Sequence, residues 1–254
     1  MLFEIVKYSV LTVIVLYLIL CMSMRLPIRE AQRKTGECTM YYVVNSDGMK
    51  GLGHSILVLE NEEGYGTVLS FNGMQRTLSQ ALLGKAGVGK MSMGQMDAGQ
   101  MQEFLKTGNL ELEGDQLWDN YDLALYQNIT TEEYEAVLQA AEIYIKTGDE
   151  YGELYVRYLY ADESCKEKYR RQLEEMGKDD SLPLYRLYTN NCDHVARLLI
   201  ACADKDMIRY NERTHRITPN GNLKAFGMSA EAWGVMELGD NSFGEKVLQF
   251  LMIF

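Results

Sequence analysis

Short apolar runs open the main part of the chain and predict a sheet. Residues 39–46 (TMYYVVNS) and 54–60 (HSILVLE) are apolar and rich in β-branched and aromatic residues, and residues 65–71 (YGTVLSF) follow after a Glu-Asn-Glu-Glu-Gly turn. Runs of this length separated by turn residues are typical of consecutive antiparallel strands. The sequence therefore predicts that the folded domain begins with a small antiparallel sheet.

Helical periodicity appears in the second half of the chain. Thr130 can cap a helix while Glu133 reaches back to it, and apolar residues then recur at helical spacing until about Gly148. Residues 162–177 form a second amphipathic pattern in which Glu and Lys are interleaved, so its charges indicate a solvated face. Residues 77–108 are rich in Gly and Met without a clean period, and we expect loops and short helices there.

A last helix has a cysteine at its start. Residues 183–189 (PLYRLYT) are expected to be extended, and Asn-Asn-Cys-Asp then leads into an apolar helix over residues 194–203. Cys192 therefore lies at a predicted helix N-terminus. Strands first and helices later indicate an α+β domain.

The N-terminal segment predicts a membrane anchor. From Tyr8 to Met24 the chain carries no charge and is rich in Leu, Ile and Val, at the short end of what spans a bilayer. A cleaved signal peptide is the alternative, but Glu4 weakens a basic leader region and no small-residue cleavage signature follows clearly. We therefore expect a single-pass N-terminal anchor with its basic flank over residues 1–34.

The side of the membrane is open at this stage. Four basic residues follow the apolar segment, whereas Lys7 alone precedes it, and the positive-inside rule then keeps the domain in the cytoplasm. A domain outside the cell is the other alternative.

Composition limits the partners. The chain has 254 residues with 25 Lys and Arg against 36 Asp and Glu, for a net charge of −11. Such an acidic surface repels phosphate backbones, so we expect no nucleic-acid partner. The five cysteines are widely spaced and include no CxxC pair, which argues against a disulfide framework.

The candidate chemistry begins with Cys192. A thiol in the first turn of a helix faces unsatisfied backbone N–H groups and the positive end of the helix dipole, and both lower a thiol pKa. A histidine within hydrogen-bond reach would complete a cysteine nucleophile. His54, at the start of a strand, is the candidate base, while His194 and His215 are expected at the surface.

Three short motifs occur in an order that resembles a known superfamily. Gly53-His54-Ser55 opens one strand, residues 69–73 (LSFNG) end the next, and Asn191-Cys192 heads a later helix. This resembles the circularly permuted papain fold of NlpC-type hydrolases and lecithin:retinol acyltransferase-like proteins. The resemblance implies a permuted papain-like domain over residues 35–254 with a helical insertion at about 75–180.

The resemblance also implies roles for individual residues. Cys192 matches the nucleophile and His54 the base that accepts the thiol proton and later protonates the leaving group. Ser70 stands where a third polar residue orients the imidazole, with Asn72 on the same face of the strand.

Further residues are implied around the substrate. An oxyanion hole would use the backbone N–H of Cys192, with Asn191 bracing the turn. Thr218 and Asn220 fall in a stretch that resembles one bordering the substrate cleft.

The implied activity is that of a membrane-anchored cysteine hydrolase without a cofactor. It would cleave an amide bond in a peptide, a cell-wall peptide or an isopeptide through a thioester on Cys192. A lipid acyltransferase or esterase of the same fold is one alternative, and a non-catalytic membrane-tethered binding module is another. No His/Cys pair has the usual zinc spacing, so a metal site from Cys192, His54 and His194 is disfavoured, and residues 84–90 (GKAGVGK) lack the serine or threonine of a phosphate-binding loop.

Overall fold

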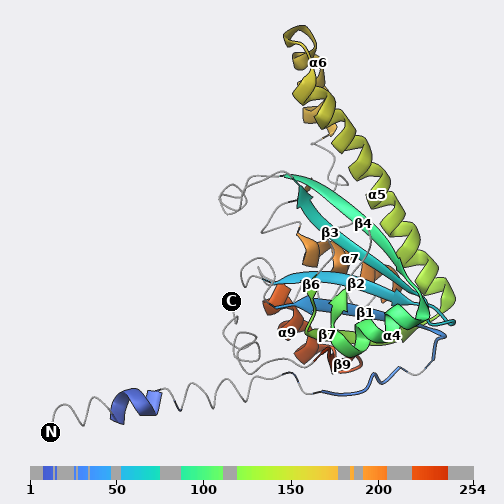
Figure 1. Ribbon diagram of the computed structural model, residues 1–254, viewed down its shortest axis with the longest axis vertical. Coiled ribbons are helices and arrows are strands. Elements are labelled where there is room, and N and C mark those ends of the chain that lie inside the picture. Colours follow the sequence, from blue (N-terminus) through green and yellow to red (C-terminus); the bar gives the residue numbers. More distant parts are fainter. Residues whose placement is uncertain are drawn as a thin grey trace.

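A computed structural model gives the architecture of the chain. It describes residues 8–13, 15, 26, 28–33, 35–46, 53–74, 87–110, 119–176, 184–185, 191–204 and 219–239. Strands and helices are mixed in a layered arrangement around one antiparallel sheet (Figure 1). The predicted α+β class with an antiparallel sheet and a cysteine-headed helix is confirmed.

The main sheet has the strand order β8-β4-β3-β2-β1-β7-β9, and every adjacent pair is antiparallel. A separate two-stranded ribbon pairs β5 with β6. The strands are β1 Cys38–Asn45, β2 His54–Glu60, β3 Gly66–Met74, β4 Gly87–Met96, β5 Asn109–Leu110, β6 Asp119–Asn120, β7 Leu123–Ile129, β8 Leu184–Tyr185 and β9 Gly234–Glu237. The three strands predicted from the first apolar runs are therefore confirmed as β1, β2 and β3.

Two apolar cores lie on opposite faces of the sheet. On one face, α5 (Thr131–Tyr160), α7 (Cys192–Ala203) and α9 (Pro219–Ser229) contribute to the larger core with Leu57, Leu59 and Phe71. On the other face, α4 (Ala98–Thr107) packs through Met101 and Phe104 against Ile56, Val58 and Val68. Figure 1 shows α4 in front of the strands and α7 behind them. We call these the α7 face and the α4 face.

The predicted cap of the long helix is confirmed, but the predicted end of that helix is wrong. The Thr130 hydroxyl accepts from the Glu133 N–H at 3.3 Å, and the Glu133 carboxylate accepts from the Thr130 N–H at 2.8 Å. The helix α5 then continues through Gly148 to Tyr160. One glycine in a helix costs only about 1 kcal/mol, which neighbouring turns readily offset.

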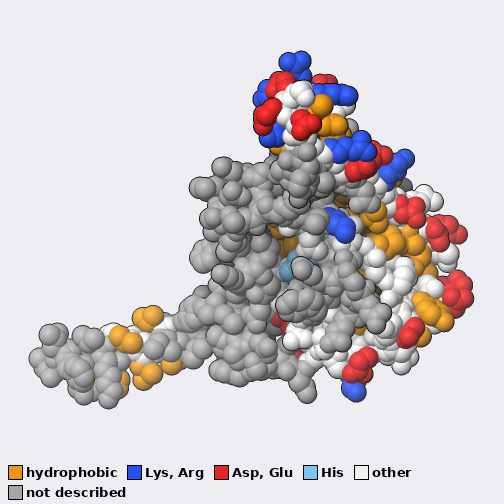
Figure 2. Space-filling model, turned by 45° about the horizontal axis from the view of Figure 1, so that its top comes forward, with side chains coloured by type: hydrophobic (Ala, Val, Ile, Leu, Met, Phe, Trp, Pro, Cys, Tyr) orange, Lys and Arg blue, Asp and Glu red, His pale blue; other side chains and the backbone are white. Residues whose placement is uncertain are grey.

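The helix predicted over residues 162–177 is confirmed as α6 (Glu163–Met176). None of its residues is buried, and three exposed pairs link Glu167 to Arg170 and Arg171 and Arg170 to Glu174. Figure 1 shows α6 and the end of α5 projecting away from the sheet, and Figure 2 shows Lys, Arg, Asp and Glu side chains intermixed on this projection.

The helical insertion predicted over residues 75–180 is wrong as a description of that segment. It contains β4 and β7, which pair with β3 and β1 inside the main sheet, besides α4, α5 and α6. The expectation of loops and short helices over residues 77–108 fails for the same reason over Gly87–Met96. Alternate side chains of β4 enter the two cores, Met91 on the α7 face and Met96 on the α4 face. Methionine suits these positions because its flexible side chain fills irregular gaps in a core.

The predicted membrane anchor falls mostly outside the described residues. Residues 8–13 and 15 are helical, and Tyr8, Val10, Leu11, Val13 and Val15 expose their side chains. Within the residues that the structure describes, no helix is both long enough and apolar enough to span a bilayer. The anchor over residues 1–34 stays a prediction.

Candidate functional site

Cys192 is the first residue of α7, as predicted. Asn191 has an extended backbone and caps the helix, since its Oδ1 accepts from the His194 N–H at 3.0 Å. An asparagine at this position satisfies one of the N–H groups that a helix start leaves open. The bracing role expected for Asn191 therefore has a geometric basis, and it fixes the turn that carries the thiol.

The Cys192 thiol lies inside the core of the α7 face and is 1% exposed. Burial raises its pKa to about 11, the backbone and side chain of the nearby Ser55 oppose this rise, and the neighbouring Asp193 carboxylate adds to it. The free energy needed to remove a thiolate from water is larger than the stabilisation that the helix N-terminus provides. The expectation of a lowered pKa is wrong for this conformation, in which Cys192 is a protonated thiol at neutral pH.

His54, Ser70 and Asn72 do come together. His54 Nε2 lies 3.3 Å from Ser70 Oγ, and Asn72 Nδ2 donates to the same oxygen at 3.0 Å. His54 and Ser70 are buried, Ser70 completely. The contact between the imidazole and a polar residue of the next strand is thus the one that the sequence indicated.

This histidine group leaves the sheet on the α4 face. In β2, Leu57 and Leu59 belong to the core of the α7 face, whereas Ile56 and Val58 belong to that of the α4 face. Successive side chains of a strand alternate between faces, so Ser55 points to the α7 face and His54 to the α4 face. The same alternation in β3, where Phe71 is on the α7 face, sends Ser70 to the α4 face.

Consequently the structure pairs Cys192 with Ser55 and His54 with Ser70, on the two sides of β2 and β3. The predicted transfer of a proton from Cys192 to His54 requires both side chains on one face. The described conformation therefore holds the two predicted catalytic residues apart.

The strand ends near His54 are less fully paired than the rest of the sheet. The ladder of β2 with β3 runs from Leu57 to Glu60, while β2 pairs with β1 along its whole length, from His54 to Glu60. Gly53, directly before His54, has a positive φ of 88°. Among the described strand ladders, the start of β2 pairs with β1.

A buried polar network that the sequence analysis missed fixes the first turn of α7. The Asp193 carboxylate accepts from the Tyr42 hydroxyl on β1, from Asn222 Nδ2 on α9 at 2.6 Å and from Arg197 Nε at 3.1 Å. The Asp193 and Arg197 side chains are 1% and 3% exposed. A carboxylate next to the candidate nucleophile, with an arginine four residues later, was the available signal.

The structure describes the two predicted cleft residues, Thr218 and Asn220, only in part. Thr218 lies outside the described residues, as does His215. Asn220 lies in the first turn of α9, and its side chain is likewise outside the description. The neighbouring Asn222 is the residue of this segment that contacts α7, through its hydrogen bond to Asp193.

Within the described part of the chain, no group of three His, Cys, Asp or Glu side chains could hold a metal ion.

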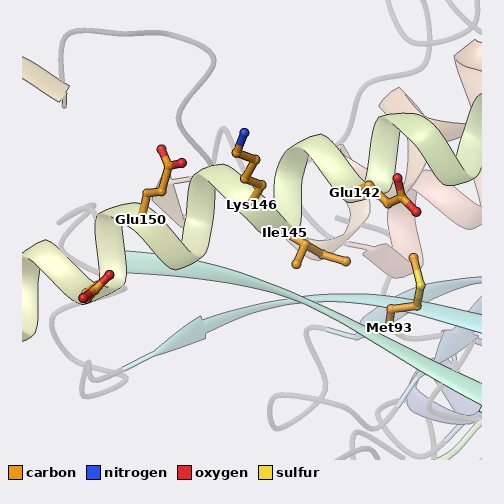
Figure 3. Close-up of a pocket in the computed structure, with 6 residues that line it drawn as sticks. Met93, Glu142, Ile145, Lys146 and Glu150 are labelled. Atoms are coloured by element: carbon orange, nitrogen blue, oxygen red, sulfur yellow. The ribbon is translucent and has the colours of Figure 1, made fainter.

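A groove of about 450 Å³ lies elsewhere, between α5 and β4. Figure 3 shows Ile145 directed toward the strands and Lys146 and Glu150 directed away from them. Met93, Glu142 and Glu153 complete its lining. None of these residues belongs to the Cys192 or the His54 group, so this groove is separate from the predicted site.

Comparisons with known proteins supply no relative: no family model, no curated protein and no solved structure matches the chain.

Proposed function

We propose that this protein is a membrane-anchored thiol hydrolase of the permuted papain-like class, which cleaves an amide bond through a thioester on Cys192. The proposal is supported above all by one observation. Cys192 begins a capped helix that packs on β2 and β3, the two strands that carry His54 and Ser70. This order of histidine strand, neighbouring strand and cysteine helix is what the resemblance of the three short motifs implies.

The proposed reaction has two steps. The Cys192 sulfur, after giving its proton to His54, attacks the carbonyl carbon, the C–S bond forms, the C–N bond breaks and the amine leaves with that proton. Water then attacks the thioester, which releases a carboxylic acid and restores the thiol. Backbone N–H groups at the start of α7 would stabilise the oxyanion.

The proposed reaction needs a change at the start of β2. His54 and Cys192 leave the sheet on opposite faces in the described conformation, and the thiol is buried and protonated. His54 is the first residue of its strand, follows a glycine with positive φ and is held in the ladder through β1. A turn of the chain at Gly53 would bring the imidazole to the α7 face, because glycine is free to adopt other backbone angles.

A second candidate function is a non-catalytic, membrane-tethered binding module. It is favoured by the raised pKa of Cys192 and by the placement of His54 with Ser70 on the α4 face. A binding module has no need for an ionised thiol, and a fold does not by itself establish an activity.

Acylation by p-nitrophenyl acetate separates the two candidates. The full chain in detergent is mixed with the ester, and acetylated cysteines are mapped by mass spectrometry before and after hydroxylamine. A hydrolase is expected to acetylate Cys192 with a burst of p-nitrophenol, and His54→Ala should slow this at least about a hundredfold, the usual contribution of a general base. Cys38, another buried cysteine, is the internal control.

Two outcomes of the acylation experiment would contradict the hydrolase proposal. If Cys192 is acetylated no faster than Cys38, or if His54→Ala leaves its rate unchanged, the hydrolase proposal fails and the binding module replaces it. Accessibility of the domain to an added protease in intact cells then tests a cell-wall substrate, since a protected domain excludes one.

A further inference from the structure

The Ser55 hydroxyl is a buried polar group without a hydrogen-bond partner among the described residues. Ser55 is 1% exposed, and its Oγ makes no such hydrogen bond among the described residues. Burying a hydroxyl without a partner costs about 1–3 kcal/mol, so proteins rarely leave one inside a core. A hydroxyl in this position therefore calls for an explanation.

The reactive group nearest to that hydroxyl is the Cys192 thiol. Ser55 leaves β2 on the α7 face, where Leu57 and Leu59 of the same strand pack in one core with Cys192. The backbone and side chain of Ser55 lie close enough to the sulfur to lower the pKa of the thiol, while the hydroxyl itself has no hydrogen-bond partner in the described conformation. Sulfur is a weak acceptor as a thiol and a strong one as a thiolate.

The Asp193 backbone also favours ionisation of the sulfur, whereas the other polar side chains near it disfavour ionisation or are neutral. Asp193 on α7 contributes a negative charge, and Tyr42 on β1 and Tyr185 on β8 carry hydroxyls whose own pKa values are raised by burial. Arg197 is paired with Asp193 at 3.0 Å. Among these neighbours, Ser55 has the hydroxyl that makes no hydrogen bond in the described residues and is therefore available to donate to the sulfur.

We infer that Ser55 is a catalytic residue of the Cys192 site, whose hydroxyl donates a hydrogen bond to the sulfur when the thiol loses its proton. This inference rests on the proposed function for its catalytic meaning. The hydroxyl keeps its own proton throughout, and the thiol proton leaves to the base. Ser55, rather than Ser70, would then be the serine that serves the nucleophile.

The rate of Cys192 modification by methyl methanethiosulfonate tests this inference. The reagent is small and reacts with thiolate, so the rate between pH 7 and 11, followed by mass spectrometry of the Cys192 peptide, reports the ionised fraction. We expect Ser55→Ala to lower the rate about tenfold at each pH below the thiol pKa, because a hydrogen bond to a charged group is lost. Ser55→Thr, which keeps a hydroxyl, should restore most of the rate.

Ser92→Ala is the matched control, since it removes a buried serine hydroxyl of β4 from the opposite face and should leave the Cys192 rate within about twofold of wild type, below the effect of one hydrogen bond. Equal or faster modification in Ser55→Ala would overturn the inference. So would a Ser55→Thr variant that is as slow as Ser55→Ala. Modification by methyl methanethiosulfonate needs no substrate. The effect of Ser55 on the thiol can therefore be confirmed even if p-nitrophenyl acetate fails to acylate Cys192, so failure of the inference and failure of the proposed function are distinguishable.

Discussion

The two faces of β2 carry different chemistry although they belong to the same seven residues. On the α7 face, Ser55 meets the Cys192 thiol beneath a helix that is tied down by the Asp193 network. On the α4 face, His54 meets Ser70 and Asn72. The first group contains the proposed nucleophile, and the second contains the proposed base.

This contrast shows how strongly one step along a strand decides function. Moving by one residue reverses the face, so a thiol and an imidazole can lie on adjacent elements and still be separated by the sheet. The following changes act on one face at a time.

The largest expected effect is on the α7 face. Asp193→Ala removes the acceptor shared by Tyr42, Asn222 and Arg197 and breaks the buried ion pair with the Arg197 guanidinium. We expect the free energy of unfolding in urea to fall by about 3–5 kcal/mol, as is usual when one partner of a buried ion pair is removed. Glu167→Ala, which breaks only exposed pairs on α6, should leave the urea midpoint unchanged. A midpoint for Asp193→Ala equal to that of the control would show that the network does not hold α7.

The next effect concerns the helix of the α4 face. Gly108 ends α4 with φ of 71°, and a Cβ there would meet the Tyr121 carbonyl oxygen at 1.9 Å. Gly108→Ala should lower the free energy of unfolding by about 2–3 kcal/mol because it adds strain and a backbone clash. Gly99→Ala, in the first turn of the same helix, places a Cβ 3.2 Å from the Asp97 carboxylate oxygen and should change the free energy of unfolding by less than about 1 kcal/mol. If both variants unfold at the same urea concentration, the α4 cap contributes nothing.

Alkaline pH should weaken the α7 face through Cys192. Its pKa is about 11 in the folded chain against 9.0 for an ordinary thiol, so between these values the unfolded state releases a proton that the folded state keeps. Stability is therefore full below about pH 9 and declines as the pH rises toward 11, by on the order of 2 kcal/mol.

Buried tyrosines add to this decline, so the informative comparison is with Cys192→Ala. Urea unfolding of both proteins at pH 8 and pH 10.5 should show a steeper loss for the wild type. Parallel losses would mean that the thiol is not held in its protonated form by burial.

The smallest effect is expected for Ser70→Ala on the α4 face. The Asn72 amide loses its acceptor and His54 its neighbour, so stability should fall by about 1 kcal/mol, the usual value of one hydrogen bond. Chemical denaturation measures this loss. A change above about 3 kcal/mol, the upper range for one hydrogen bond, would indicate that Ser70 organises far more of the sheet than its two contacts suggest.

Much of the local structure follows from the sequence because local rules decide it. The apolar runs of β1 to β3, the Thr130 capping box and the cap at Asn191 each depend on neighbours within a few residues. By contrast, β4 has glycines and methionines where strand formers are expected, and only its pairing with β3 and β8 makes it a strand.

The sequence does not predict on which face of the sheet the site lies. In β2, Ile56 and Val58 are as apolar as Leu57 and Leu59, because both faces of the strand are buried. A strand of this kind has no polar side, so its sequence does not say which face will receive α7. That choice depends on packing between segments more than a hundred residues apart, and with it the choice between Ser55 and His54 as the neighbour of Cys192.

Cross-linking tests the separation of the two groups most directly. Ser55→Cys and His54→Cys are prepared in turn, each protein is oxidised with copper phenanthroline, and disulfide-linked peptides containing Cys192 are identified by mass spectrometry. A disulfide forms only between cysteines whose Cα atoms lie within about 7 Å and whose side chains point toward each other. The structure predicts that Ser55→Cys links to Cys192 quickly, whereas His54→Cys, which needs the proposed change at Gly53 to reach the α7 face, links far more slowly. Efficient linkage from His54→Cys with none from Ser55→Cys would contradict the account and place the histidine on the same face as the thiol.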